Sequence, residues 1–391
     1  MKITIHRGTH QIGGTITEIQ SEKARIFIDM GEELPNEDKP SSPIEIEGVM
    51  TSNVNCDAVF FTHNHGDHIG MFSRINKSIP LYLGEASKEI YLTLQKYLKS
   101  THLNHLEQII TFKAMDKISI KDITVTPLLV DHSAYDAYMF IIESDGKKIL
   151  HTGDFRNHGF KGKGLLKMLS VYAKDIDLLI TEGTTLSRSY QTVLSESELK
   201  NKAEKLLSEK KYVFVLCSST NIDRISAFYQ ANPHGKYFVC DEYQKDILGI
   251  VEKHGAKYTD LYQYKNVHIY SSKLVSILKA QGFCMLVRNN PKFAKIMKQF
   301  DPAECLVIYS MWQGYLEGKN NDLKDFLNDY QWISLHTSGH ASQETIQEVI
   351  GLLNPKVGVI PIHSENPEML NHLRVSSRVI MLQDKESFEL D

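Results

Sequence analysis

Apolar and polar positions follow different patterns in the two halves of this 391-residue chain. In the first half, short β-branched runs that end close to Gly, Asn or Asp predict strands at Lys2–Ile5, Arg25–Asp29 and Ala58–Thr62. Ser144-Asp145-Gly146 lies between the apolar runs Tyr138–Glu143 and Lys148–His151, which predicts a β-hairpin. Apolar residues at helical spacing over Glu85–Ser100 predict an amphipathic helix.

After about residue 190, buried strands alternate with helices. Ser195 and Glu198 form a capping box, which opens a predicted helix over Ser195–Lys210. Apolar runs, each followed by a helical segment, recur at Tyr212–Cys217, Tyr237–Cys240, Cys284–Val287 and Cys305–Tyr309. Two more strand-to-helix units extend from Ile333 to Leu353 and from Val357 to Leu373. This alternation predicts an α/β fold in which helices cover a parallel sheet.

The strand predicted at Ala58–Thr62 leads into a cluster of metal-binding residue types, His63, His65, Asp67 and His68. Imidazoles and a carboxylate suit zinc, and ligands on both sides of one loop suggest two ions. A regular strand or helix could not point all four side chains one way. We therefore expect a tight loop in which Gly66 supplies backbone freedom. A chance cluster or a helix cap is a poor alternative for the spacing HxHxDH.

Three further polar residues follow apolar strands in the same way. His132 comes just after Thr126–Val130, Asp154 just after Lys148–Leu150, and His363 just after Val357–Ile362. Strand ends at one edge of a sheet are where sites in α/β-type folds gather. Each residue alone could equally be an ordinary surface residue. Together with the HxHxDH loop, His132, Asp154 and His363 are expected to complete a metal site.

Composition and charge indicate the cellular location of the protein more clearly than its substrate. The formal net charge of −4 argues weakly against a nucleic-acid protein, but two Zn²⁺ ions would add about four positive charges at the site. The five cysteines form no CxxC pair, which favours a reducing cytoplasm over disulfides or a cysteine–zinc site. The chain begins without an apolar signal region and has no run of 18 apolar residues, so export and membrane spanning are not expected.

The ordered motifs resemble the metallo-β-lactamase superfamily over nearly the whole chain. The residues that carry this resemblance are His63, His65, Asp67, His68, His132 and Asp154. Glu182 in Thr181–Thr184, His340 in Ser338–Ala341 and His363 in Pro361–Glu365 resemble the three added motifs of its β-CASP branch. That branch contains ribonuclease J and the endonuclease subunit of the pre-mRNA cleavage and polyadenylation factor. Cys217–Asn221 and Tyr309–Tyr315 are similar to the domain that is inserted in this branch.

The resemblance implies an αββα metallo-β-lactamase sandwich, formed by residues 1–190 and 330–391. An α/β β-CASP domain with a parallel sheet, at 190–330, would cover it and leave the active site in the cleft between them. The resemblance further implies that one Zn²⁺ is held by His63, His65 and His132, and the other by Asp67, His68 and His363. Asp154 would bridge the two ions. Mn²⁺ is the alternative metal, because His/Asp sites bind several divalent ions.

The expected reaction is hydrolysis of RNA phosphodiester bonds by a water activated between two metal ions, as an endonuclease, a 5′ exonuclease or both. His340 would protonate the leaving 3′ oxygen or stabilise charge on the phosphate, and Glu182 would orient His340 or His68. Asp154 would act through the metals. Ser338, Ser218 and Ser219 lie at strand-to-helix turns and, with His340, are candidates for binding phosphates. Helix capping is the structural alternative for the three serines, Glu182 and His340.

Single-stranded RNA is the expected partner, with a homodimer as a further expectation and no membrane contact. DNA is the first alternative, although DNA-repair members of the superfamily tend to have valine where this chain has His363. A non-hydrolytic binding protein would typically lack several of the ligands present here. Thioesterases and lactamases do without the inserted domain. The chain ends soon after His363, so the additional C-terminal domain of ribonuclease J is not expected in it.

Two aromatic residues in the Tyr309–Tyr315 segment have an unsettled role. Trp312 and Tyr315 could stack on RNA bases. Aromatic side chains that follow an apolar strand more often pack in the core, so core packing is the more ordinary expectation for both.

Overall fold

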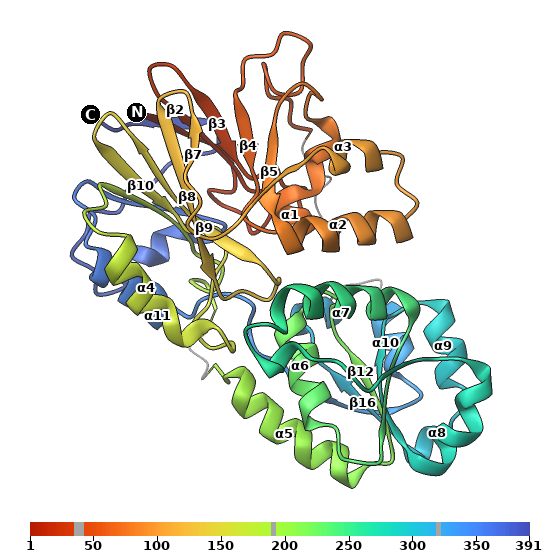
Figure 1. The fold of residues 1–391 in the computed structure, drawn as a ribbon. Helices are drawn as coiled ribbons and strands as arrows, with labels where there is room; N and C mark the ends of the chain where they lie inside the picture. The colour runs from red at the N-terminus through yellow and green to blue at the C-terminus, as the bar shows by residue number, and fades with distance from the viewer. Residues whose placement is uncertain (35–42, 189–192, 318–321) are drawn as a thin grey trace. The chain divides into compact units, whose positions relative to one another are not determined.

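The chain folds into two compact units in the structure, a computed structural model that describes residues 1–34, 43–188, 193–317 and 322–391. Unit 1 comprises Met1–Asn157, Lys161–Gln191 and Gly339–Asp391. Unit 2 comprises His158–Phe160 and Thr192–Ser338. Each unit has its own sheets and helices (Figure 1). Across these described ranges, no helix combines the length and apolar character needed to cross a membrane.

Unit 1 contains two mixed sheets within the described residues. The first has the order β19 (Glu386–Glu389), β1 (Lys2–Arg7), β2 (Ile16–Gln20), β3 (Arg25–Ile28), β4 (Ala58–Phe60), β5 (Leu81–Gly84) and β6 (Ile110–Phe112). The second has the order β18 (Gly358–Ile362), β11 (Leu178–Glu182), β10 (Lys147–His151), β9 (Ala137–Ser144), β8 (Ile123–Val130) and β7 (Ile118–Ile120). The helices of unit 1 are α1 (Gly66–Ile69), α2 (Glu85–Tyr97), α3 (Leu103–Glu107), α4 (Leu165–Tyr172) and α11 (Gln343–Leu353).

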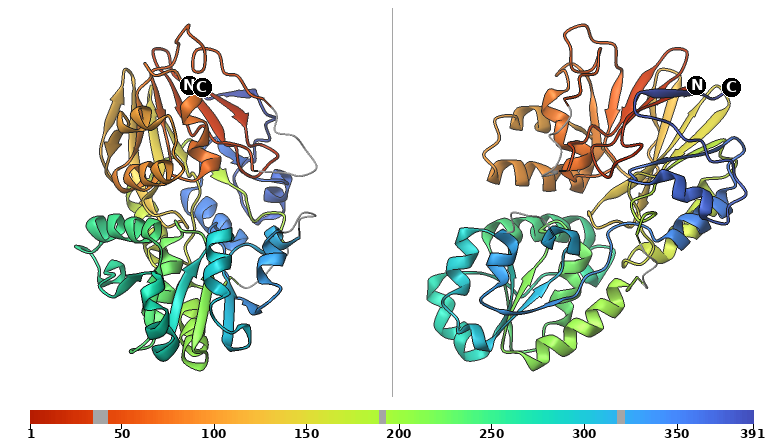
Figure 2. Two further views of the ribbon diagram at one scale, coloured as in Figure 1. Left: turned by 90° about the vertical axis from the view of Figure 1, so that its right-hand side faces the viewer. Right: turned by 180° about the vertical axis from the view of Figure 1, so that it is seen from behind.

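Successive side chains of a strand point into different layers of unit 1. In β4, Phe60 belongs to the core between the two sheets, where its ring lies 5.8 Å from that of Phe140 in β9. The preceding residue, Val59, packs instead with Tyr91 of α2. A third core joins the second sheet to α4 and α11, which lie side by side (Figures 1 and 2). This helix–sheet–sheet–helix order confirms the predicted α/β fold.

Unit 2 contains one fully parallel sheet within the described residues. Its order is β14 (Val267–Ile269), β13 (Tyr237–Cys240), β15 (Phe283–Val287), β12 (Tyr212–Leu216), β16 (Cys305–Tyr309) and β17 (Gln331–Ser334). Its helices are α5 (Glu196–Glu209), α6 (Ile222–Ala231), α7 (Glu242–Gly255), α8 (Val275–Gln281), α9 (Pro291–Met297) and α10 (Asp322–Leu327). Helices flank the central strands on both sides (Figure 1). The five residues of β12 are all buried, as their apolar sequence predicted.

Two local predictions are confirmed and one is shortened. Asp145 and Gly146 both have positive φ, 51° and 72°, and join β9 to β10 as a two-residue hairpin. Ser195 accepts the N–H of Glu198 in a complete capping box. The helix predicted over Glu85–Ser100 ends at Tyr97. Leu98, an apolar residue at helical spacing just past this end, is 63% exposed.

A glycine outside the HxHxDH loop, Gly31, allows the backbone of that loop to pack close to its own. A Cβ at Gly31 would lie 1.7 Å from the carbonyl oxygen of Asp67, so no larger residue fits there. The adjacent Met30 N–H donates to the carbonyl of His68 at 2.7 Å, which holds the two segments together. Gly66 has no positive φ, and a Cβ there would meet nothing within 4 Å. The expectation that Gly66 supplies the required backbone freedom is therefore wrong.

We predict opposite effects for alanine at these two glycines. Gly31→Ala should lower the free energy of unfolding by about 2–3 kcal/mol, because the added methyl group overpacks the loop backbone. Gly66→Ala, in the first turn of α1, should leave it unchanged or raise it by up to about 1 kcal/mol. Urea unfolding in chelator, so that bound metal adds nothing, measures both. Equal losses for the two variants would contradict this assignment.

Candidate metal centre

The carboxyl ends of five strands bring predicted site residues of unit 1 together, along with Asp131 and Thr184, which were not predicted. They contribute as follows: His63, His65, Asp67 and His68 after β4; Asp131 and His132 after β8; Asp154 after β10; Glu182 and Thr184 from the end of β11; and His363 after β18. The strand-end pattern in the sequence therefore corresponds to a real cluster. Its histidines are buried except His65 and His340, which are partly exposed.

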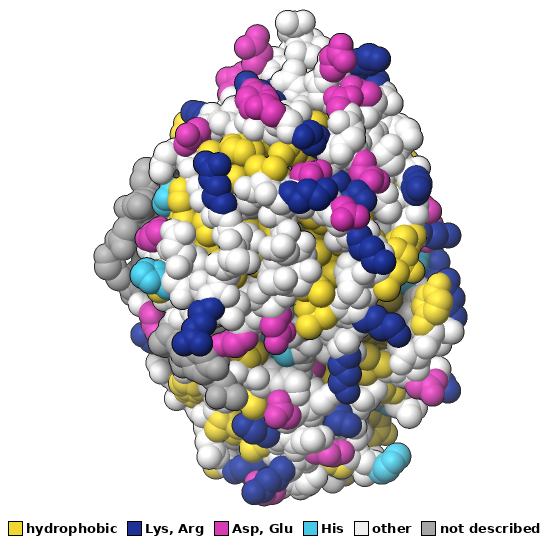
Figure 3. Space-filling view, turned by 90° about the vertical axis from the view of Figure 1, so that its left-hand side faces the viewer, with side chains coloured by type: hydrophobic (Ala, Val, Ile, Leu, Met, Phe, Trp, Pro, Cys, Tyr) yellow, Lys and Arg dark blue, Asp and Glu magenta, His cyan; other side chains and the backbone are white. Residues whose placement is uncertain are grey.

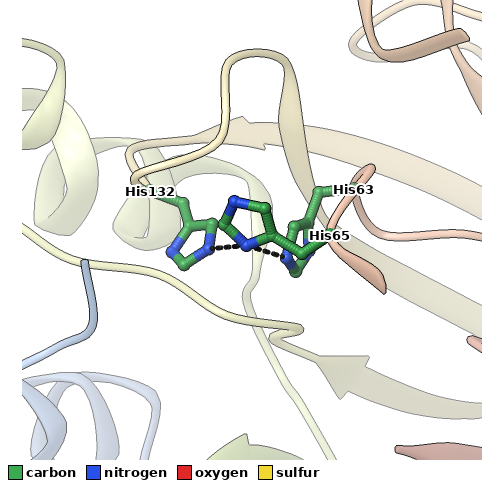
Figure 4. A group of neighbouring side chains, drawn as sticks. All are labelled: His63, His65 and His132. Atoms are coloured by element: carbon green, nitrogen blue, oxygen red, sulfur yellow. Dashed lines mark hydrogen bonds between the residues drawn. The ribbon is translucent and has the colours of Figure 1, made fainter. Parts of the chain in front are cut away.

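Three imidazoles converge at one side of the cluster. His65 Nδ1 lies 3.1 Å from His63 Nε2 and 3.2 Å from His132 Nε2, as the dashed lines in Figure 4 mark. His63 and His65 come from the loop after β4, whereas His132 follows β8. Zinc–nitrogen bonds of about 2.0–2.1 Å in a tetrahedral site place neighbouring nitrogens about 3.3 Å apart. The spacing of these three nitrogens therefore fits one zinc-sized ion.

A second group lies beside the first. Asp67 Oδ2 is 3.3 Å from His363 Nε2 and 4.0 Å from His68 Nε2. Asp154 Oδ2 lies 3.1 Å from His68 Nε2, 3.9 Å from the Nε2 atoms of both His132 and His363, and 4.0 Å from that of His63. One carboxylate oxygen thus contacts or approaches both groups. Asp154 Oδ1 is buried and has no hydrogen-bond partner among the described residues, so it can serve as a ligand.

Hydrogen bonds behind the imidazoles determine which nitrogen faces inward. The Thr62 hydroxyl donates to Asp29 Oδ2 at 2.8 Å, so its oxygen accepts from His63 Nδ1 at 3.0 Å. His68 Nδ1 donates to the same Asp29 oxygen at 2.7 Å. In its neutral form, each ring therefore carries its proton on Nδ1 and presents the lone pair of Nε2 to the cluster. That tautomer is the one a metal ion requires.

The other two buried rings are oriented by distant segments. His132 Nδ1 lies 2.7 Å from the carbonyl oxygen of Gly339, to which it donates. His363 Nδ1 lies 2.8 Å from Thr184 Oγ1, whose hydroxyl donates to the His363 carbonyl at 3.3 Å. His363 itself has a φ of 53°, an uncommon backbone conformation that accompanies this placement. Both rings therefore also direct Nε2 into the cluster.

The protein environment keeps the first group of imidazoles neutral. Burial, reinforced by the neighbouring His68 and His132, holds the pKa of His63 well below its usual value. Burial likewise lowers the pKa of His65 to about 4 and that of His132 well below the usual range. Metal ions bind neutral imidazoles, so no proton has to be displaced from these three near neutral pH.

The second group is arranged around negative charge. Burial opposes ionisation of Asp67 and Asp154, but His68 and His363 lower the pKa of both carboxyl groups. Burial also opposes a charge on His68, yet Asp154, Asp29 and Asp67 raise its pKa well above the usual value. Carboxylates that hold a buried imidazolium in this way can hold a cation in its place.

Glu182 orients His340. Glu182 is fully buried at the end of β11; its Oε1 accepts the N–H of Phe155 at 2.8 Å, and its Oε2 accepts from His340 Nδ1 at 3.0 Å. His340 Nδ1 also lies 3.5 Å from Asp154 Oδ2. Burial opposes charge on His340, but Glu182 and Asp154 raise its pKa. Of the two imidazoles that Glu182 was predicted to orient, it contacts His340. The side chain that caps the N-terminus of α11 is that of Ser342, not that of His340.

The three candidate phosphate-binding serines belong to unit 2. Ser218 Oγ lies 3.2 Å from Thr220 Oγ1 in the turn before α6. Ser219 Oγ accepts from Arg288 Nη1 at 3.1 Å. The carbonyl oxygen of Ser338 accepts from His158 Nε2 at 2.7 Å. The helix after this turn is capped by Asn221, so the capping alternative does not account for Ser218 and Ser219.

Sequence reasoning missed three residues that shape the site: Asp29, Thr62 and Thr184. Asp29 follows an apolar strand, so the rule that found His132 and Asp154 could have found it. It lies at a positive φ of 62° and is completely buried. Thr184 lies in the motif Thr181–Thr184, which predicted a role for Glu182 alone. No signal in the sequence pointed to the carbonyl of Gly339.

Comparisons with known proteins identify the fold family of this arrangement. Residues 24–209 match the family described as "Beta-lactamase superfamily domain", and residues 321–376 match "Zn-dependent metallo-hydrolase RNA specificity domain". The chain belongs to the metallo-β-lactamase superfamily, in its ribonuclease J-like β-CASP branch. It is therefore a metal-dependent hydrolase, and its His/Asp cluster offers groups of side chains that could hold a divalent metal ion.

Individual relatives have low sequence identity to this chain, but the similarity extends along most of its length. Ribonuclease J of Mycoplasma genitalium is 22% identical over 93% of this chain and 68% of its own length. Ribonuclease J of Helicobacter pylori strain B128 is 25% identical over 100% of this chain and 60% of its own length. A crystal structure of an Enterococcus faecalis protein of unknown function superposes with a TM-score of 0.80 at 22% identity, covering 100% of this chain and 99% of that one. The last similarity shows the fold alone.

Proposed function

We propose that this chain is a ribonuclease that hydrolyses phosphodiester bonds of single-stranded RNA with two zinc ions. The observation that carries the proposal is the convergence of all seven predicted ligands in a chain whose C-terminal part matches an RNA specificity domain. In this proposal, unit 1 is the metallo-β-lactamase domain and unit 2 is the β-CASP domain. Similarity to ribonuclease J proteins along nearly the whole chain supports RNA over other substrates.

The proposed ligand sets follow the two groups of side chains. His63, His65 and His132 would hold one ion, and Asp67, His68 and His363 the other, with Asp154 between them. Two divalent ions held by these residues would supply a lowered pKa for a bound water and stabilisation of negative charge on a phosphate. Mn²⁺ remains the alternative to Zn²⁺, because the set offers only imidazole nitrogens and carboxylate oxygens.

The proton step falls to His340 in this proposal. Its Nδ1 is committed to Glu182, so Nε2 is the atom that can give a proton to the leaving 3′ oxygen. The raised pKa of His340, which results from Glu182 and Asp154 despite burial, keeps that proton available near neutral pH. Glu182 is thus a positioning residue. Ser338, Ser218 and Ser219 remain proposed contacts to backbone phosphates.

The test compares nucleic acids and metal ligands in one experiment. Zinc-loaded protein should cleave 5′-labelled single-stranded RNA much faster than matched DNA, and chelator should abolish cleavage. The double variant His65→Ala, Asp67→Ala removes one ligand from each set and should lose metal and activity together. His234→Ala, at an exposed position of unit 2, is the matched histidine control and should behave as wild type. The ladder of products separates internal cuts from mononucleotide release at the 5′ end.

Two results would count against the proposal. Equal cleavage of DNA would leave a nuclease without preference for RNA. Stoichiometric metal binding without cleavage of either polymer would remove nuclease activity altogether and direct the search to smaller esters.

A further inference from the structure

Two aromatic side chains at the end of β16 are exposed, although core packing was the ordinary expectation for them. Trp312 is 46% exposed and Tyr315 is 55% exposed. Their ring centroids lie 5.4 Å apart with an angle of 83° between the planes. Two perpendicular rings at this distance form a corner, in which a flat group can stack on one ring and meet the other at its edge.

The Trp312 ring is held in place by its own turn. A Cβ at Gly314 would lie 2.3–2.5 Å from three carbons of the indole, so the ring packs directly on the Gly314 backbone. The Tyr309 hydroxyl donates to the carbonyl oxygen of Trp312 at 2.7 Å. Gly314 has no positive φ, and the space that the indole takes is the reason that a glycine is needed there. A ring fixed in this way loses little conformational freedom when a ligand stacks on it.

The topology of the sheet places this corner where ligands bind in α/β folds. Leu216 of β12 pairs with Val287 of β15 and with Tyr309 of β16, so the three strands end level with one another. After β12 the chain crosses to β13 on one side, and after β16 it continues to β17 on the other. The strands β12 and β16 therefore flank a topological switch point, beside which small ligands bind in open parallel sheets.

A basic group lies at the same edge. Arg288 follows β15, contacts Ser219 and forms an ion pair with Asp241, which also lies 3.5 Å from Lys292 Nζ. Two cations therefore share the carboxylate of Asp241 here. The chain as a whole is not basic, with a formal net charge of −4, and basic and acidic side chains are interspersed on the face that Figure 3 shows.

We propose that the carboxyl edge of the unit 2 sheet binds a nucleotide of single-stranded RNA, with its base stacked on Trp312 in the corner formed with Tyr315. Arg288 contacts a neighbouring phosphate in this proposal. Aromatic rings beside basic groups are the arrangement by which proteins hold single strands without reading sequence. Arg288 follows β15 and Trp312 follows β16; these two strands lie on either side of β12, about 10 Å apart at a strand spacing of 4.8 Å. The inference rests on the proposed ribonuclease function, whose substrate it would bind.

Tryptophan fluorescence tests the stacking directly, since the chain contains only Trp312 and Trp332. In Trp332→Phe, Trp312 is the only tryptophan, and titration with a short oligouridylate in chelator should quench its emission. In Trp312→Phe, the remaining tryptophan on β17 should show no more quenching than free N-acetyltryptophanamide, which corrects for absorption by the RNA. Chelator prevents cleavage, so the readout does not depend on activity.

Affinity provides the second measurement. By anisotropy of labelled oligouridylate, Trp312→Ala should raise Kd about 10-fold, because stacking on an aromatic ring is lost. Trp312→Phe retains a stacking ring and should stay within about 3-fold of wild type. Tyr258→Ala is the matched control: Tyr258 is 80% exposed in the same unit and follows α7, which runs back toward the opposite edge of the sheet. It should not change Kd.

The outcomes separate this inference from the proposed function. RNA that binds without quenching Trp312, or an unchanged Kd in Trp312→Ala, overturns the stacking site even if wild-type protein cleaves RNA. Absence of RNA binding by every variant overturns both. Loss of an oligomer in Trp312→Ala at unchanged Kd would identify the corner as an interface between copies of the chain and likewise overturn the nucleotide site.

Discussion

Asp154→Asn should reduce RNA hydrolysis by at least about 1000-fold, because its carboxylate oxygen lies within 4.0 Å of members of both sets of proposed ligands. A metal ion contributes several kcal/mol to stabilising a phosphoryl transition state, and about 4 kcal/mol corresponds to this factor. Asparagine preserves the size of the side chain but removes the charge that lies 3.1 Å from His68 Nε2 and 3.9 Å from His363 Nε2. The bound zinc should fall below two ions per chain.

Metal analysis and single-turnover cleavage of labelled RNA measure this prediction together. Asp136→Asn is the matched control, since Asp136 is another buried carboxylate of unit 1. It accepts the N–H of Ser87 and the hydroxyl of Tyr138 and belongs to no group of candidate ligands. This variant should keep its zinc. If Asp154→Asn retained two ions and full activity, the bridging role would be excluded, and His340, which lies near Asp154, Glu182 and His363, would become a candidate ligand.

Local elements of the fold could be predicted because local interactions determine them. Positive φ at Asp145 and Gly146 satisfies a hairpin whatever surrounds it, and Ser195 caps α5 through a residue three positions away. The end of α2 was less predictable. Apolar residues continue in helical register through Leu98, but the structure leaves that side chain exposed, and sequence spacing alone does not show where the core ends.

The candidate site could be predicted to the level of residue types and strand ends, but no further. The sequence alone shows that each candidate ligand lies just past an apolar strand. It does not show which nitrogen each imidazole presents, since that depends on contacts such as that of His132 with Gly339, 207 residues away in the chain. The need for a glycine also depends on residues that are distant in the sequence. No local pattern marked Gly31, because the atom that a Cβ there would strike belongs to Asp67.

Unit 2 contains a buried ion pair that no sequence motif indicated. Breaking it should lower the free energy of unfolding more than Gly31→Ala does. Arg224 and Glu196 are both fully buried, with Arg224 Nε 3.0 Å from Glu196 Oε2 and Nη2 3.1 Å from Oε1. The guanidinium also donates to Ser310 Oγ at 2.6 Å. Glu196→Gln leaves this cation without its carboxylate and should lower the free energy of unfolding of unit 2 by about 3–5 kcal/mol.

A double variant separates the cost of an unpaired buried charge from the contribution of the ion pair itself to the free energy of unfolding. Replacing both partners, as in Glu196→Gln, Arg224→Met, removes the uncompensated charge, and this double variant should be more stable than Glu196→Gln alone. Unfolding in urea, followed by the emission of Trp312 and Trp332 in unit 2, measures the cycle. If the double variant lost the sum of the two single losses, the pair would contribute through packing. A smaller loss in the double variant would show that the buried charge is what destabilises the single variant.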